Sequence, residues 1–160
     1  MRKLPPDPRR RLIVRAVLHT DGGARGNPGP AGIGVVLADS DGKVLGEHAE
    51  YIGRATNNVA EYRALIAGLE LALARGVTDI EVHVDSELVV AQLEGRWRIR
   101  NERLRTLAAQ AGALLTRFSS VDLTHVRRAL NARADELANQ GMDDAGPGDY
   151  EEGGQASLLE

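Results

Sequence analysis

The sequence predicts an α/β fold, in which a mixed β-sheet carries helices on its faces. Three β-type segments come before any helix, and the rest of the chain alternates strands with helices. A meander of antiparallel strands followed by such alternation places parallel and antiparallel strands in one sheet. The length of 160 residues fits a single domain. A domain of this size buries enough surface to fold without disulfide bonds.

The first three segments form the meander. The alternating run "RLIVRAVLHTD" (11–21) predicts a strand that ends on Asp21. Segments 31–40 and 43–53 flank "DSDG" and predict a hairpin. The glycine-rich stretch "TDGGARGNPGPAG" (20–32) joins the first strand to this hairpin, and it begins at the same acid.

The clearest helix spans residues 57–76. Thr56 or Asn57 is a suitable N-cap, the body is rich in Leu, Ile and Ala, and Gly76 is a suitable C-terminal stop. The remaining elements follow in order: a strand at 79–85, a helix at 86–95 capped by Ser86, a helix at 101–118 capped by Asn101, a strand at 121–126 and a helix at 131–141.

The two ends differ in composition from the predicted domain at 11–141. Residues 1–10 are basic and proline-rich and predict a flexible arm, whereas the acidic, glycine-rich residues 142–160 predict a disordered tail. The net charge of −3 conceals a basic domain, because residues 1–142 hold 20 basic and 17 acidic side chains. Bases gather in "RWRIRNERLR" (96–105). This cluster suits a polyanionic partner, and a solvated basic face is the alternative.

Several functional classes are excluded by composition. The chain contains no Cys, which removes disulfides, zinc–thiolate centres and thiol nucleophiles. No run of about 18 apolar residues is present, and the basic N-terminus lacks the apolar core of a secretory signal. We therefore expect a cytoplasmic protein without membrane contact, and no obligate protein partner is evident.

Four acidic residues are predicted to point toward one region of the domain. Asp21 and Asp85 are each expected at the end of a strand, where open α/β sheets place their sites. Glu61 lies in the first turn of the long helix and shares its apolar face with Leu65. Asp135 lies in the last helix among small residues. Taken singly, each has a structural explanation: a helix cap near Asp85, an acid favoured by the helix dipole at Glu61, or a solvated acid at Asp135.

Taken together, the four acids predict a site for metal ions. Like charges that converge in a core repel one another unless cations neutralise them. Oxygen ligands without Cys favour Mg²⁺ or Mn²⁺ over zinc. Two such ions about 3.5–4 Å apart are suited to in-line displacement at a phosphodiester.

Four motifs in this order make the chain resemble a known family. "TDGGARGNPGPAGIG", "TNNVAEYRALIAGLELAL", "VDSELVV" and "NARADELAN" are similar to the motifs of type 1 ribonuclease H, and the resemblance runs from about Arg11 to Gly141. It implies the ribonuclease H-like fold, with a five-stranded sheet of three antiparallel and two parallel strands. It also implies endonucleolytic cleavage of the RNA strand of RNA–DNA hybrids, leaving 5′-phosphate and 3′-hydroxyl ends. The implied catalytic residues, which also bind two Mg²⁺ ions with Mn²⁺ as a possible substitute, are Asp21, Glu61, Asp85 and Asp135.

The resemblance also implies contacts with the substrate. The backbone at Gly22 and Gly23, with the side chains of Asn57 and Asn58, corresponds to positions that meet the minor groove of the hybrid. Without a Cβ, these glycines would let nucleic acid approach closely. Asn27 and Thr56 correspond to positions that hold a phosphate of the DNA strand, and Ser86 is also placed near the substrate. Turn formation by Asn27 and helix capping by Thr56 or Asn57 are the structural alternatives.

Three departures from the family pattern bear on substrate binding. Glu87 stands where many members have Gln, so the side-chain amide donor is missing at this position. The segment after the third motif runs directly into the next helix, without an extra basic helix, as in compact archaeal-type members. Trp97 and Arg98 could partly replace that helix. The loop "RRAL" (127–130) lacks the family's mobile His. The candidate auxiliary residues there are His125, Arg127 and Arg128.

Other functions remain open at this stage. His19 with Asp21 and His83 with Asp85 are i, i+2 pairs on strands, which permits a His/Asp site for a transition metal. The same fold could serve a resolvase- or transposase-like DNA nuclease, or a catalytically silent module that binds hybrids. The domain could also be a structural fragment of a larger protein.

Overall fold

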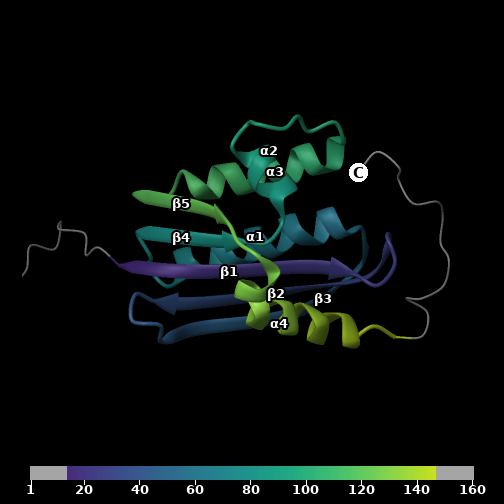
Figure 1. The fold of residues 1–160 in the computed structure, drawn as a ribbon, viewed down its shortest axis with the longest axis horizontal. Coiled ribbons are helices and arrows are strands. Elements are labelled where there is room, and N and C mark those ends of the chain that lie inside the picture. The colour runs from purple at the N-terminus through teal and green to yellow at the C-terminus, as the bar shows by residue number, and fades with distance from the viewer. Residues whose placement is uncertain (1–13, 147–160) are drawn as a thin grey trace, which may run out of the picture.

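The computed structural model describes residues 14–146, and its centre is a five-stranded sheet in the order β3-β2-β1-β4-β5 (Figure 1). The strands are β1 (Arg15–Ala24), β2 (Gly29–Asp39), β3 (Val44–Ala55), β4 (Asp79–Val84) and β5 (Ser120–His125). Strands β1, β2 and β3 pair antiparallel, whereas β4 is parallel to β1 and β5 is parallel to β4. The predicted mixed sheet and its strand directions are therefore confirmed.

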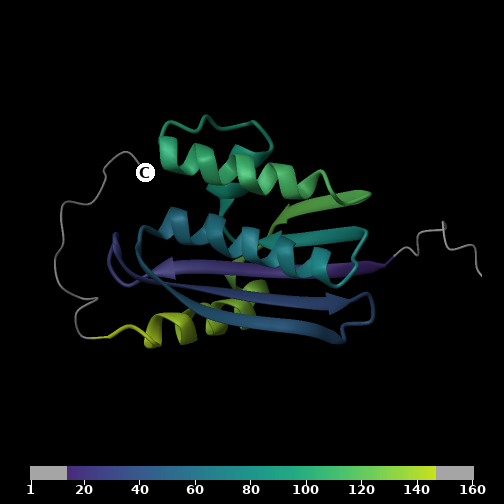
Figure 2. The same ribbon diagram turned by 180° about the vertical axis from the view of Figure 1, so that it is seen from behind.

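Helices cover both faces of this sheet. They are α1 (Asn57–Ala74), α2 (Glu87–Leu93), α3 (Glu102–Leu115), the 3-10 turn η1 (Arg128–Asn131) and α4 (Ala132–Asp143). Helices α1 and α3 lie on one face, and α4 crosses β1, β2 and β3 on the other (Figures 1 and 2). Within residues 14–146, no helix combines the length and the apolar character that crossing a membrane requires.

The helix ends follow the predicted capping chemistry. The Thr56 hydroxyl accepts from the Val59 amide at 3.3 Å and so caps α1. Ser86 and Asn101 cap α2 and α3 in the same way. Each cap satisfies an amide that would otherwise lack an intrahelical partner, and is worth about 1 kcal/mol.

The main core lies between the sheet and the α1–α3 layer. Its fully buried members include Leu18 and Leu37 from the sheet, and Tyr62, Leu65 and Leu69 from α1. Full burial of one Leu contributes about 1.5–3 kcal/mol, so the α1 face is a principal source of stability.

Helix α4 packs on the opposite face through glycine. A Cβ on Gly34 would lie 2.1 Å from the Ala134 carbonyl oxygen, and one on Gly32 would lie 2.4 Å from that of Ala138. Only glycine in β2 allows the helix backbone to come this close. The small residues of α4 serve the same close contact, and they bring Asp135 next to the sheet.

The structure corrects two expected element ends. Strand β1 does not end on Asp21, because Gly22, Gly23 and Ala24 continue its pairing with β2. Helix α4 ends at Asp143 rather than at residue 141, and Met142 is buried near Gly23. The predicted arm at 1–10 and residues 147–160 of the predicted tail lie outside the described residues.

Candidate active site

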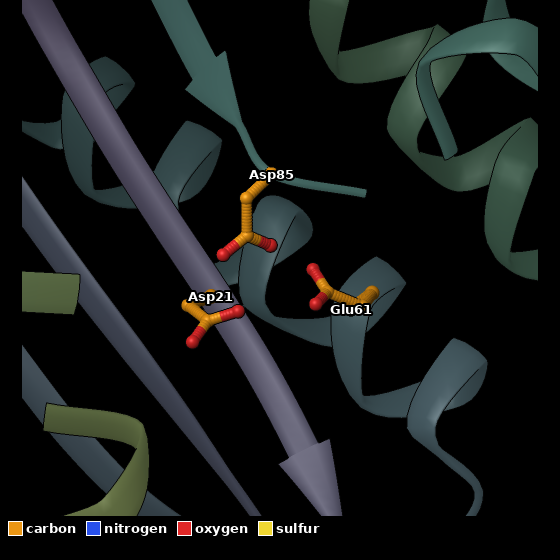
Figure 3. A group of neighbouring side chains, drawn as sticks. All are labelled: Asp21, Glu61 and Asp85. Atoms are coloured by element: carbon orange, nitrogen blue, oxygen red, sulfur yellow. The ribbon is translucent and has the colours of Figure 1, made fainter. Parts of the chain in front are cut away.

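Three carboxylates from three separate elements converge at the middle of the sheet (Figure 3). Asp21 comes from β1, Glu61 from α1, and Asp85 directly follows β4. One oxygen from each lies within 4.8 Å of the others. Asp21 is 6% exposed and Glu61 9%, and the Asp85 side chain is 5% exposed. Among residues 14–146, no other group of three His, Cys, Asp or Glu side chains gathers as closely.

Strand register brings the two aspartates together. Thr20 of β1 pairs with Val84 at the end of β4. The residues that follow, Asp21 within β1 and Asp85 just after β4, therefore lie side by side at the same level. In Figure 3 both side chains point toward the same space, which Glu61 enters from the helix.

Glu61 reaches this space because α1 lies directly against β1 at Gly22. A Cβ on Gly22 would lie 2.2 Å from the Ala60 carbonyl oxygen, so this position requires glycine. The Gly22 amide also donates to the Glu61 carboxylate. Gly22 thus serves helix packing. Glu61 is the fifth residue of α1 and stands beyond its first turn, which removes the helix dipole as an explanation for it.

Asp135 lies beside the three carboxylates without joining their close group. It stands in the first turn of α4, is half-buried, and contributes to the charge that acts on Asp21. A cavity of about 620 Å³ extends from the cluster; it is lined by Asp21, Gly22, Gly23, Ala24, Arg25, Asn57, Glu61, Arg128, Asp135, Asn139 and Met142. Three of the four predicted acids therefore converge tightly, and the fourth stands on the wall of the same cavity.

The cluster carries more negative charge than the surrounding side chains neutralise. Burial, with repulsion from Asp85, raises the pKa of Asp21 to about 7. Burial, with repulsion from Asp21, raises the pKa of Glu61 well above its ordinary value. Glu61 Oε2 and Asp85 Oδ2 are buried and have no hydrogen-bond donor among the described residues.

The nearest cation does not satisfy this charge. Arg128 Nε lies 4.0 Å from Asp85 Oδ2, which is an ion-pair distance but too long for a hydrogen bond. The Arg128 side chain is also 83% exposed. Buried carboxylate oxygens without donors, in an all-oxygen set, fit a divalent cation of the Mg²⁺ or Mn²⁺ type.

Among the residues predicted to contact the substrate near α1, Asn57 is hydrogen-bonded to the loop between β1 and β2. The Asn57 amide donates to Asn27 Oδ1 at 3.0 Å, and Asn57 Oδ1 accepts from the Ala24 amide at 2.9 Å. Thr56 is buried as a helix cap, and Asn58 is half-buried. Asn57 is exposed and lines the cavity, as does Gly23. Thr56 therefore caps α1, Asn27 holds the start of α1, and Asn57 remains accessible.

The auxiliary residues lie at two places around the site. His125 and Arg127 are exposed at the end of β5 and just after it. Trp97 and Arg98 are exposed in the connection from α2 to α3, which contains no extra helix. The absence of that helix was predicted from the sequence.

The two His/Asp pairs do not form a joint metal site. His19 and His83 lie edge to face, with ring centroids 4.6 Å apart. His19 Nδ1 is 3.0 Å from Asn131 Oδ1, and His83 Nε2 is 3.4 Å from Glu81 Oε2. Each ring is therefore held by a side chain outside the acid cluster, which argues against the transition-metal alternative.

Comparison with known proteins decides the family. Residues 19–141 match the family described as reverse transcriptase-like. Ribonuclease HI of Halobacterium salinarum is 51% identical over 131 residues, which cover 82% of this chain and 66% of that protein. The crystal structure of RNase H1 from the same archaeon superposes with a TM-score of 0.80, covering 82% of this chain and 99% of that one. The chain belongs to the ribonuclease H family.

Two further ribonuclease H relatives extend the comparison. LC11-RNase H1, solved in complex with an RNA/DNA hybrid, is 44% identical with a TM-score of 0.76, covering 80% of this chain and 96% of that one. The bifunctional protein Rv2228c of Mycobacterium tuberculosis is 50% identical over 133 residues, which cover 82% of this chain. The match spans only 36% of that longer relative.

One residue of this ribonuclease H-family site was missed by sequence reasoning. Asn131 is 1% exposed; its Nδ2 donates to the Thr20 carbonyl at 2.8 Å, while its Oδ1 accepts from His19 Nδ1. It precedes α4 yet makes no cap bond there, because its side chain is engaged with β1. Asn131 thus ties the start of the helix that carries Asp135 to the strand that carries Asp21. From the sequence it reads only as the first residue of the last predicted helix.

Proposed function

We propose that this chain is an endoribonuclease that hydrolyses the RNA strand of RNA–DNA hybrids and leaves 5′-phosphate and 3′-hydroxyl ends. The observation that carries the proposal is the convergence of Asp21, Glu61 and Asp85, with two buried oxygens that lack donors. Membership of the ribonuclease H family and the hybrid-bound structure of LC11-RNase H1 support it.

Two Mg²⁺ ions, with Mn²⁺ as a substitute, are the proposed cofactors. Asp21, Glu61 and Asp85 would hold them together with Asp135 from the cavity wall. When bound, the ions supply an activated water and stabilise charge on the leaving oxygen. The fit rests on the all-oxygen donor set, the unsatisfied Glu61 and Asp85 oxygens, and the raised pKa of Asp21.

The chain itself positions these ligands. The Gly22 amide fixes Glu61, and the register of β1 with β4 sets Asp21 beside Asp85. Because these groups are held by strands and a capped helix, little rearrangement is needed before the reaction.

The walls of the cavity are proposed to bind the hybrid. Arg128 is exposed beside the carboxylates and is suited to a phosphate. Exposed Asn57, with Asn58 and the backbone of Gly22 and Gly23, is proposed to read the minor groove. The RNA strand would be recognised there by its 2′-hydroxyls rather than by base sequence. Asn27, Thr56 and Ser86 are proposed to support the backbone of the hybrid.

The proposal is tested with labelled RNA–DNA hybrid, duplex DNA and duplex RNA, each with Mg²⁺ or Mn²⁺. The wild-type chain should cut only the RNA strand of the hybrid, and Asp21→Asn should cut nothing. Cleavage of duplex DNA would instead support a resolvase-like nuclease. Tight hybrid binding without cleavage by the wild type would identify a silent binding module.

A further inference from the structure

The single tryptophan of the chain stands on the surface, in the connection between α2 and α3. Trp97 is 44% exposed. We call residues 94–103 the arginine loop, because Arg96, Arg98, Arg100 and Arg103 surround this ring in the sequence. Figure 1 shows the connection as the teal segment at the top of the molecule. An exposed Trp among arginines is a composition typical of binding surfaces.

The backbone of the arginine loop is held in place, so the exposure of Trp97 belongs to an ordered segment. The amides of Arg96 and Trp97 both donate to the Ala91 carbonyl, at 2.9 and 3.2 Å. At the far end, Arg105 Nη2 donates to the Ile99 carbonyl at 3.0 Å, and Ile99 packs on the core. The backbone that carries Trp97 is therefore anchored on both sides of this residue.

Most of the positive charge in the loop is uncompensated. Arg96 pairs with Glu94 at 3.0 Å. Arg98, Arg100 and Arg103 are exposed, and none has an acidic partner within the part of the chain that the structure describes. Exposed guanidinium groups that form no ion pair, in the same segment as an exposed aromatic ring, are suited to bind phosphates and bases together.

The indole indicates which form of nucleic acid fits. Inside a duplex, both faces of each base are covered by neighbouring bases, so an aromatic side chain stacks most readily on an unpaired base. The loop also lies close to the acid cluster along the chain. Helix α2 begins two residues after Asp85 and has seven residues, a length of about 10 Å.

We propose that the arginine loop binds a single-stranded stretch of nucleic acid that continues from the hybrid. Trp97 stacks on an unpaired base, while Arg98, Arg100 and Arg103 contact its phosphates. The placement beside a hybrid rests on the proposed function, but binding of a free single strand does not. The loop would make the protein prefer hybrids that carry an unpaired tail over blunt hybrids.

The first test uses the fluorescence of Trp97, which no other tryptophan obscures. Oligothymidylate and oligouridylate of about 10–15 nucleotides, a length within the usual range of single-strand sites, are titrated into Asp21→Asn, which cannot cleave them. Saturable quenching by either is expected, and the two arms show whether DNA or RNA is preferred. The logarithm of affinity should fall with that of salt by about 0.7 per phosphate contact. The absence of quenching by both oligonucleotides at low salt would overturn the proposal.

Matched variants locate the binding. Trp97→Ala should weaken binding of the oligonucleotide about tenfold, measured by anisotropy of a labelled strand, whereas Trp97→Phe should retain most of it. Arg98→Ala with Arg100→Ala should reduce the salt slope by about 1–2. Arg117 is an exposed arginine after α3, and Arg117→Ala serves as the charge control. It should change neither the affinity for the oligonucleotide nor the salt slope. Equal losses in Arg117→Ala and the loop variants would show that only overall charge matters, against the proposal.

The second test uses cleavage. Wild type should have a KM several-fold lower for a hybrid with a single-stranded tail than for the blunt hybrid, and Trp97→Ala should remove this difference. If Trp97→Ala weakened both substrates equally, the loop would bind the duplex and the proposal would be wrong. If the wild type cut no hybrid at all, the proposed activity would fail, and the fluorescence titration would still decide single-strand binding.

Discussion

Two pairs of ionisable residues occupy neighbouring positions on the same two strands, yet their surroundings differ. His19 and His83 pair across β1 and β4, and each finds a partner, in Asn131 and Glu81. Two residues further along, Asp21 and Asp85 meet Glu61, another acid, and buried oxygens of this cluster lack donors. The histidine pair finds its partners within the folded chain, whereas the acid cluster leaves buried carboxylate oxygens without donors. Unsatisfied buried polar atoms therefore mark the site more clearly than the residue types do.

The largest expected effect comes from removing one charge of the acid cluster. Asp21→Asn should lower hybrid cleavage by a factor of at least about 10²–10³, because the central ligand loses its charge. The matched change at the histidine pair, His83→Gln, should leave cleavage within a few-fold of wild type. Steady-state rates with Mg²⁺ measure both. Comparable losses in the two variants would remove the distinction between the pairs.

The acid cluster also predicts a pH-dependent stability that metal reverses. Burial and repulsion raise the pKa of Asp21 from 3.8 to about 7, so the folded, metal-free protein keeps a proton that the unfolded chain has released. The free energy of unfolding should therefore fall as pH rises from about 4 to about 7, by roughly 2–4 kcal/mol. Urea unfolding with EDTA at pH 5 and pH 8 measures this.

The variant and the ion serve as controls for that pH effect. Asp21→Asn should remove most of the decrease in unfolding free energy with pH, because the main titrating group is gone. Excess Mg²⁺ should restore stability at pH 8 more than at pH 5. A metal-free wild type that is equally stable at both pH values would contradict the assignment of a strained acid cluster.

Much of this fold could be predicted from the sequence, because its signals are local. Alternation identified the strands, and caps such as Thr56, Ser86 and Asn101 marked the helix starts. Three of the four predicted acids meet closely, as expected from two acids near strand ends and one on the apolar face of α1. Glu61 points inward as its spacing from Leu65 indicated.

The features that could not be predicted depend on contacts between distant segments. Gly22 and Gly23 look like a turn in the sequence, but β2 pairs with them and extends β1. Asn131 looks like the first residue of a helix, and only the fold shows that its side chain is bound to β1. Gly22 resembles a ligand-binding glycine, yet the backbone of α1 occupies the space beside it. Local sequence patterns do not show which distant segments of the chain come into contact.

A smaller effect is expected where α1 approaches the acid cluster. Gly22→Ala should destabilise the protein by about 1–3 kcal/mol and reduce cleavage, because its Cβ would displace Ala60 and with it Glu61. Gly112→Ala is the matched control, since the space around Gly112 is open and Ala favours the helix by up to about 1 kcal/mol. Thermal unfolding compares the two. A neutral Gly22→Ala would show that the helix has room to shift.

The smallest effect should come from Asn131, which is bonded to His19 of the histidine pair and to Thr20, the residue before Asp21. Asn131→Ala removes bonds to both Thr20 and His19, and should cost about 1–2 kcal/mol of stability. It should also raise the Mg²⁺ concentration required for half-maximal cleavage, since Asp135 is no longer held near Asp21. Asn131→Asp, which turns a buried carboxylate oxygen toward the Thr20 carbonyl, should lose at least as much stability at neutral pH. A stability loss without any change in metal dependence would limit Asn131 to a structural role.

The central claim is that Asp21, Glu61 and Asp85 form a binding site for divalent cations. Isothermal titration of Mn²⁺ and Mg²⁺ into the metal-free protein at pH 8 tests it directly, with Glu61→Gln and His83→Gln as the paired variants. The account predicts saturable binding in the wild type and in His83→Gln, and a loss of affinity of at least about tenfold in Glu61→Gln. Unchanged binding in Glu61→Gln, or its loss in His83→Gln, would contradict the account.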